Sequence, residues 1–340
     1  MPRIDSDAHV IENELTWEYM DGADAKYKPF TVVPRDGDGS TSYWAIDGHL
    51  IPRGANEGGE MSKESREMSD IQARIKHMDE LEVDVQVLFP SLFLRPLTDR
   101  PEVEVALCRS YNRWLADVWR RGKGRLRWAA ILPLMSMDAS IEEAKFAKDN
   151  GGCALYTRGI FEERVLTDSY YDPIYKTASD LDIPVCVHAA TPSFHWDTTF
   201  DNEIGFAKFK LPAVSTFHSL IADGLPQRFP QLRYGFIEVS SQWVPYALHD
   251  LARRFEKRGK QLSKDILRES RIYVACQVDD DIPYVLKYAG EDNLVIGSDY
   301  GHADTATELE ALAKLRLTGE VSATAINKIL DDNARALYGL

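Results

Sequence analysis

The chain has 340 residues, of which 44% are hydrophobic and 28% are charged, and its formal net charge is -14 at pH 7. This is an ordinary globular composition, and the length suits one large domain or two small ones. The acidic charge argues against nucleic acid or anionic lipid as a partner, and the absence of an apolar run of 18 residues argues against a membrane-spanning helix.

The first predicted element is a short strand over residues 4–10, where apolar and polar positions alternate. Residues two apart in a strand share a face, so Asp7 and His9 are expected side by side. A long irregular region follows over 26–67, with turn-forming clusters at 36–40 and 56–59 and a predicted hairpin over 43–51. An insertion of this length in a compact domain is usually functional or disordered. We interpret it as a flap over the end of the first strand.

From residue 83 onward, predicted strands and helices alternate. The strands are predicted over 83–90, 126–133, 153–158, 184–188, 232–239, 272–276 and 294–299. The helices are predicted over 101–121, 138–150, 170–181, 208–224, 243–257 and 283–289, with two more at the C-terminus. Such alternation indicates a parallel sheet, and eight units favour a (β/α)8 TIM barrel formed by a single domain, 1–340, with 26–67 as an inserted flap. The competing doubly wound sheet lacks support, because no GxGxxG follows the first strand.

Polar residues gather where the predicted strands end, which is where a barrel carries its chemistry. They are Asp7, His9, His188, Glu238, Asp299 and His302. Six nitrogen and oxygen donors are more than one tetrahedral zinc needs. They suit two metal ions, or one ion with a carboxylate and a histidine that handle protons.

Each of these residues also has a simpler interpretation. Asp7 or Asp299 alone could cap a helix, and His188 alone could be a hydrogen-bonded core histidine. Glu238 lies in an apolar run and could pair with Arg158. Burying a carboxylate without a cation is costly, however, and a metal ion is one such cation.

Several motifs resemble the amidohydrolase superfamily, in particular its amidohydrolase-related (amidohydrolase 2) branch related to aminocarboxymuconate-semialdehyde decarboxylase. They are Asp7-x-His9, Val185-Cys-Val-His188 and Ile296-Gly-Ser-Asp-Tyr-Gly-His302, together with 227–233 and 243–246. The resemblance implies that Asp7, His9, His188 and Asp299 are metal ligands. There are two departures: Asp7 stands where better-known members carry His or Glu, and Glu238 stands where the branch carries a proton-handling histidine.

These departures lead to two competing functions. Three carboxylates and three imidazoles suit iron or manganese at least as well as zinc, and Glu238 with His302 could hold a second ion. The leading expectation is therefore an O2-dependent hydroxylase of a small organic acid with a dinuclear Fe or Mn centre, by resemblance to a few superfamily members. The alternative is a zinc or manganese hydrolase or decarboxylase, with Asp299 or Glu238 as a base. The third possibility is a non-catalytic subunit that keeps a metal for folding and assembly. His302 completes the set of expected catalytic residues.

Five residues are candidates for contact with the substrate. Arg158, at the end of the fourth strand, could bind a carboxylate in a bidentate fork or form a salt bridge in the next loop. His195 and Trp196 follow the fifth strand and are expected either beside the barrel mouth or in an exposed loop. Tyr43 and His49 lie on the flap, where they could close over the pocket and exclude water.

The expected partners are a small-molecule substrate and, for the hydroxylase, O2. The family resemblance also implies a homo-oligomer or a complex with a related subunit. The four cysteines are scattered, with no CxxC pair, and fit a reducing cytoplasm.

Overall fold

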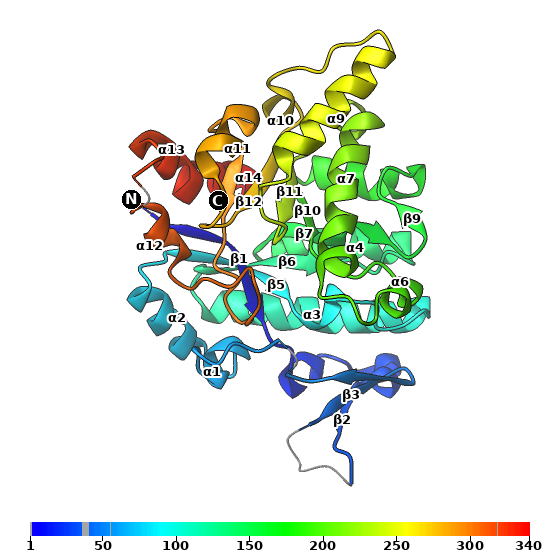
Figure 1. The fold of residues 1–340 in the computed structure, drawn as a ribbon. Coiled ribbons are helices and arrows are strands. Elements are labelled where there is room, and N and C mark those ends of the chain that lie inside the picture. The colour runs from blue at the N-terminus through cyan, green and yellow to red at the C-terminus, as the bar shows by residue number, and fades with distance from the viewer. Residues whose placement is uncertain (1, 36–40, 55, 318) are drawn as a thin grey trace.

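A computed structural model describes residues 2–35, 41–54, 56–317 and 319–340, so the predicted turn cluster at 36–40 lies outside the described residues. Eight parallel strands form one sheet in the order β1-β5-β6-β7-β10-β11-β12-β13 (Figure 1). Their bounds are β1 (Ile4–Val10), β5 (Val85–Pro90), β6 (Leu126–Ile131), β7 (Gly152–Arg158), β10 (Val185–His188), β11 (Tyr234–Ile237), β12 (Ile272–Cys276) and β13 (Leu294–Ile296).

The two ends of this sheet meet and close it. The backbone N–H groups of Ser298 and Asp299 donate to the carbonyl of Asp7 at 3.2 and 2.9 Å, and the N–H of His9 donates to the carbonyl of Tyr300 at 2.6 Å. The segment just after β13 thus lies against β1. The predicted (β/α)8 TIM barrel is confirmed.

Helices surround the sheet (Figure 1). The main ones are α2 (Ile71–Glu80), α3 (Pro101–Arg121), α4 (Met137–Asp149), α5 (Asp172–Asp180), α7 (Leu211–Ala222), α9 (Val244–Lys257) and α11 (Ile282–Ala289). The chain ends with α12 (Ala311–Leu315), α13 (Ala323–Asn327), the π-helical turn η6 (Lys328–Asp332) and α14 (Asn333–Tyr338). Short helices in the connections are α6 (Phe194–Thr199), α8 (Leu225–Arg228) and α10 (Ile266–Glu269). No helix in the described ranges combines the length and apolar character needed to cross a membrane.

The local sequence explains these elements well. Helix α3 begins with Pro101 at its first turn and ends at Gly122, as its sequence predicts, because proline lacks only an N–H that the first turn leaves unbonded. Strands covered by helices are buried on both faces. Strand β1 is the unusual case, because all seven of its residues are buried although four are polar. Those polar side chains must find their partners inside the barrel.

The region between β1 and α2 forms a separate small layer, visible beyond one end of the barrel in Figure 1. It contains the 3-10 helices η1 (Glu14–Trp17) and η2 (Gly22–Tyr27), the antiparallel strands β2 (Phe30–Val32), β3 (Tyr43–Ile46) and β4 (His49–Pro52), and α1 (Lys63–Arg66). Strands β3 and β4 form the predicted hairpin, with its turn at Asp47 and Gly48.

The flap is joined to the loop that follows β13. Gly58 N–H donates to the carbonyl of Gly301 at 3.0 Å, and Glu57 pairs with His302 in an isolated antiparallel bridge. Asn56 Nδ2 donates to Asp304 Oδ2 at 2.9 Å. A β-carbon on Gly58 would lie 2.5 Å from the His302 carbonyl oxygen, so only glycine permits this approach. The loop that carries His302 is therefore held from the flap side.

Candidate metal centre

The structure brings together the six polar residues expected at the strand ends. Asp7 and His9 lie on β1 and His188 ends β10, whereas Glu238 follows β11 and both Asp299 and His302 follow β13. Two overlapping groups of four each have donor atoms within 4.8 Å of one another. These groups are Asp7, His9, His188 and Glu238, and His9, Glu238, Asp299 and His302.

Two of the carboxylates, those of Glu238 and Asp299, are positioned at the site by an unusual backbone conformation. Glu238 and Asp299 adopt φ angles of +59° and +52°, which non-glycine residues rarely do. Such conformations cost of order 1–3 kcal/mol and persist where the surrounding structure enforces them, often at functional sites. Beside Asp299, a β-carbon on Gly297 would lie 2.2 Å from Asp7 Cβ, so β1 can approach this turn only where glycine stands. The turn after β13 thus brings Asp299 to the residues of β1.

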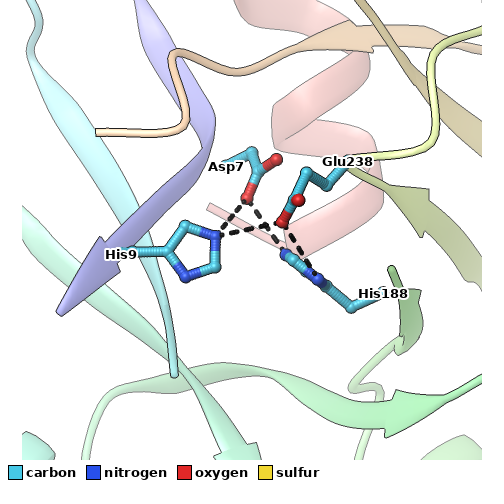
Figure 2. Close-up of side chains that lie close together, drawn as sticks. All are labelled: Asp7, His9, His188 and Glu238. Carbon is cyan, nitrogen blue, oxygen red and sulfur yellow. Dashed lines mark hydrogen bonds and ion pairs between the residues drawn. The ribbon is translucent and has the colours of Figure 1, made fainter. Parts of the chain in front are cut away.

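Carbonyl oxygens orient two of the histidine rings. His9 Nδ1 lies 2.9 Å from the carbonyl of Pro90, and His188 Nδ1 lies 3.0 Å from the carbonyl of Ala189. A carbonyl only accepts, so each Nδ1 carries the hydrogen and each Nε2 keeps its lone pair. His188 Nε2 lies 3.3 Å from Asp7 Oδ1, and Figure 2 shows both rings turned toward the carboxylates of Asp7 and Glu238.

The donor atoms fit a divalent cation. His9 Nε2 lies 3.4 Å from Asp7 Oδ1, 3.5 Å from Glu238 Oε2 and 3.3 Å from Asp299 Oδ1. Among the described residues, neither His9 Nε2 nor Glu238 Oε2 has a hydrogen-bond partner, although both atoms are buried. An ion with ligands at about 2.0–2.2 Å separates neighbouring ligand atoms by roughly 3.0–3.5 Å. The unpartnered atoms of His9 and Glu238, and the distances of 3.3–3.5 Å between the donor atoms, are therefore those expected around a bound divalent ion.

The electrostatics of the site favour a positive ion. Burial, followed by the charge of Asp299, raises the pKa of Glu238 well above its ordinary value. Burial also disfavours charge on Asp7, but the neighbouring imidazoles of His188 and His9 outweigh this effect and lower the pKa of Asp7. Burial lowers the pKa of His9, and Asp7 and Asp299 overcome this effect and raise it. The site thus gathers more buried negative charge than its imidazoles neutralise, which a divalent ion would relieve.

His302 differs from the other two histidines, because both of its ring nitrogens already have protein partners. Nδ1 lies 2.9 Å from Asp299 Oδ1, and Nε2 lies 2.7 Å from Ser91 Oγ. Its ring lies over that of His9, with centroids 3.8 Å apart. Binding a metal through His302 would require one of these hydrogen bonds to break.

A cavity of about 520 Å³ opens beside the site, with Glu238 and His302 in its lining. The flap contributes Trp44, Ile51, Pro52, Arg53, Gly54, Asn56 and Glu57 to this cavity. A second wall comes from the segment before α7, which includes the π-helical turn η5 (Phe206–Lys210), and this wall consists of Ile204, Gly205, Phe206, Phe209 and Lys210. This volume suits a small organic molecule.

Reasoning from strand ends missed six charged residues in this lining, among them Glu12, Arg95 and Lys210. Glu12 is buried, and it accepts the backbone N–H groups of Ser91 and Leu92 at 3.2 and 2.8 Å. Burial raises its pKa to about 7. The available signal was a carboxylate three residues after His9, in the loop that leaves the first strand.

The five residues expected to contact substrate lie elsewhere, since none of them belongs to the described lining of the large cavity. Arg158 lines a separate cavity of about 40 Å³, where it donates to the carbonyl of Thr191 at 3.3 Å and lies 3.7 Å from Glu162. His49 on the flap stacks against Phe194 at 4.3 Å. The remaining residues are Tyr43, which is half-buried on β3, His195, which is exposed, and Trp196, which donates to the carbonyl of Ala207 at 3.3 Å.

Comparisons with known proteins agree with this architecture. The chain matches the family described as Amidohydrolase over residues 4–340. Among solved structures, it is similar to an amidohydrolase from Mycobacterium avium subsp. paratuberculosis K-10, with 22% identity, 99% of both chains covered and a TM-score of 0.79. It is also similar to a 2,6-dihydroxybenzoate decarboxylase, with 16% identity, 100% and 99% covered and a TM-score of 0.68.

A third similar structure is a 5-carboxyvanillate decarboxylase from Novosphingobium aromaticivorans DSM 12444 with bound manganese. Its identity is 18%, 100% of this chain and 97% of that chain are covered, and the TM-score is 0.71. These identities are low, so the three structures establish the fold, and the family match over nearly the whole sequence establishes the relationship. The chain belongs to the amidohydrolase family.

Proposed function

We propose that this protein is a metal-dependent decarboxylase of a small organic acid. Asp7, His9, His188, Glu238 and Asp299 hold a divalent ion, and manganese is the first candidate. The observation that carries the proposal is the unpartnered pair of His9 Nε2 and Glu238 Oε2, buried 3.5 Å apart beside a cavity of about 520 Å³. The names of two similar structures, both decarboxylases and one with bound manganese, support this reaction and this metal.

Decarboxylation replaces the O2-dependent hydroxylation that the sequence placed first. That expectation rested on Glu238 and His302 as ligands of a second ion. His302 has protein partners on both ring nitrogens, and the relatives described above are an amidohydrolase and two decarboxylases, so neither observation supports an oxygenase. The alternative, a metal-dependent hydrolase or decarboxylase, is better supported.

Each group of the chain has a distinct task in this proposal. When bound, a divalent metal supplies Lewis-acid polarisation of a substrate oxygen. The Pro90 and Ala189 carbonyls fix the rings of His9 and His188, so that both Nε2 atoms are ready as ligands. Glu238 lines the cavity and also belongs to the metal centre, so its carboxylate links the two. The apolar flap residues limit the access of water.

Loss of CO2 breaks a carbon–carbon bond and leaves its electron pair on the substrate carbon, which must then take a proton. We assign this proton to the hydrogen-bonded pair of Asp299 and His302, because His302 lines the cavity and the two groups lie 2.9 Å apart. Ser91 Oγ, 2.7 Å from His302 Nε2, holds the ring in place. Solvent restores the proton after product leaves.

The test measures metal content, CO2 release and O2 uptake on the same purified protein. Mass spectrometry should find manganese or zinc, and 2,6-dihydroxybenzoate or 5-carboxyvanillate, among other aromatic acids, should yield CO2 that chelation abolishes. His188→Ala should lose both metal and activity. His218→Ala, which alters a histidine paired with Asp250 on the outer helices at 2.9 Å, is the matched control and should keep both.

Other outcomes would replace the proposed reaction. Oxygen consumption that depends on substrate would restore the hydroxylase, and cleavage of an ester or amide without CO2 would indicate a hydrolase. If the protein retains no divalent metal after dialysis in metal-containing buffer, the decarboxylase, hydroxylase and hydrolase proposals all fail, because each requires a bound metal.

A further inference from the structure

We infer that Arg95 and Lys210 form a carboxylate-binding subsite in the large cavity, and that the substrate carries a second carboxylate besides the group placed at the metal centre. The carboxylate at the metal centre is inferred from the proposed function. The second carboxylate is inferred from the placement and the charge of Arg95 and Lys210.

Backbone hydrogen bonds bring the two residues to the same wall. The N–H of Thr191 donates to the carbonyl of Leu94 at 2.8 Å, and the N–H of Ala190 donates to the carbonyl of Phe209 at 3.2 Å. Ala190 and Thr191 are consecutive and follow His188 by two and three residues. Arg95 and Lys210, each the next residue after a bonded carbonyl, therefore flank the segment that leaves the strand of His188. Both line the cavity.

These two cations lack internal partners. Both are half-buried, and neither side chain has a hydrogen bond or an ion pair with any residue that the structure describes. The cations around them are engaged: Arg53 binds Glu14 at 2.6 Å, and Lys208 binds Asp197 at 2.6 Å.

An unpaired positive pair is unusual in a chain whose net charge is -14. A half-buried cation without a counter-ion is only partly screened by water, so an anion that contacts both side chains gains from both charges. A carboxylate fits this pair well, because the guanidinium of arginine presents a planar fork of donors and lysine adds a compact charge.

The lining of the cavity carries charges of both signs. Four carboxylates, Glu12, Glu57, Glu238 and Asp304, lie in the same lining as the two cations, and Glu238 belongs to the metal centre. A divalent ion at the metal centre would allow one acidic group of a ligand to bind there, and the wall of Arg95 and Lys210 offers a place for another. A molecule with one acidic group at the metal and another at Arg95 and Lys210 satisfies both ends of the cavity.

The experiment measures binding rather than turnover. Calorimetry on the manganese-loaded protein compares isophthalate with benzoate, and each dicarboxylate from malonate to adipate with the monocarboxylate of equal length. We expect at least one dicarboxylate to bind about tenfold more tightly than its monoacid, which is the worth of one good charge-assisted contact. Arg95→Gln and Lys210→Gln should each remove most of this preference. High salt should weaken it as well.

Matched controls lie close by. Lys208→Gln removes a lysine from the same π-helical turn, but one that is paired with Asp197 and absent from the cavity lining. Arg100→Gln removes an exposed arginine paired with Asp47 and Glu102. Both variants should keep the preference, and all four should bind manganese as the unmodified protein does.

Two results would overturn the subsite: no dicarboxylate preferred over its monoacid, or a preference that survives in both Arg95→Gln and Lys210→Gln. Failure of the proposed function looks different. In that case no acid releases CO2, whereas the binding preference and its loss in the two variants remain.

Discussion

Glu12 permits a quantitative test of the electrostatics next to the metal centre. This carboxylate is only 3% exposed, and its partners are two backbone N–H groups rather than a cation. Burial raises its pKa from 4.5 to about 7, against the opposing effect of hydrogen bonds from Leu92 and Ser91. The perturbation is Glu12→Gln, which keeps the shape and removes the titration.

The sign and the size of the effect follow from this raised pKa. The folded protein binds the proton more tightly than the unfolded chain, so the favourable contribution is complete below pH 4.5 and is lost as pH rises to about 7. A pKa higher by about 2.5 corresponds to about 3 kcal/mol of unfolding free energy, as an order of magnitude. Glu12→Gln should therefore gain about 3 kcal/mol relative to the unmodified protein between pH 4.5 and pH 8.

Urea denaturation at several pH values, with a chelator present throughout, provides the measurement. In Glu12→Gln, the NH2 group of the side chain replaces an oxygen that accepts a backbone N–H, and the loss of this hydrogen bond costs about 1–3 kcal/mol of unfolding free energy. This cost does not vary with pH, so it cancels when the variant and the unmodified protein are compared at different pH values. Glu18→Gln, at an exposed carboxylate on the same loop, should show no such relative gain. A difference between Glu12→Gln and the unmodified protein that stays constant from pH 4.5 to pH 8 would refute the reasoning.

Three further predictions concern the metal centre. Gly297→Ala places a β-carbon 2.2 Å from Asp7 Cβ, so we expect a loss of about 1–3 kcal/mol or more in urea denaturation together with reduced metal content, and unchanged values would contradict the tight approach. Glu238→Gln should lower bound metal by at least about tenfold at limiting concentration, because it removes a charged ligand, whereas the exposed Glu256→Gln should not. Chelation should lower the melting temperature, and manganese at about 100 times its dissociation constant should restore about 2.7 kcal/mol; calorimetry that shows no such dependence argues against a folded-state site.

Much of the barrel could be predicted from the sequence, because local signals mark its elements. Pro101 and Gly122 bound α3, and the alternation over residues 4–10 marks β1. The strand ends then indicate the six polar residues that the structure brings together. Glu238 and Asp299 nevertheless fall just beyond their strands, in left-handed conformations that no apolar pattern reveals.

The cavity wall could not be predicted in the same way. Arg95 and Lys210 are placed there by hydrogen bonds of the residues before them, because the carbonyls of Leu94 and Phe209 accept from the N–H groups of Thr191 and Ala190. These residues lie in irregular connections, and Leu94 and Thr191 are about a hundred residues apart in the sequence. Arg158, chosen because it ends a strand, instead donates to the Thr191 carbonyl in a smaller cavity. The reaction is harder still to predict, because the same ligand types serve several chemistries.

The attachment of the flap to the loop of His302 has a consequence for the divergence of this protein. Insertions in surface loops usually vary independently of one another. Here Gly58, Glu57 and Asn56 are bonded to Gly301, His302 and Asp304, so a new flap sequence changes the support of a residue beside the metal centre. A flap transplanted from a relative should carry its partner loop with it, since the two segments form one inherited unit separated by more than two hundred residues of barrel.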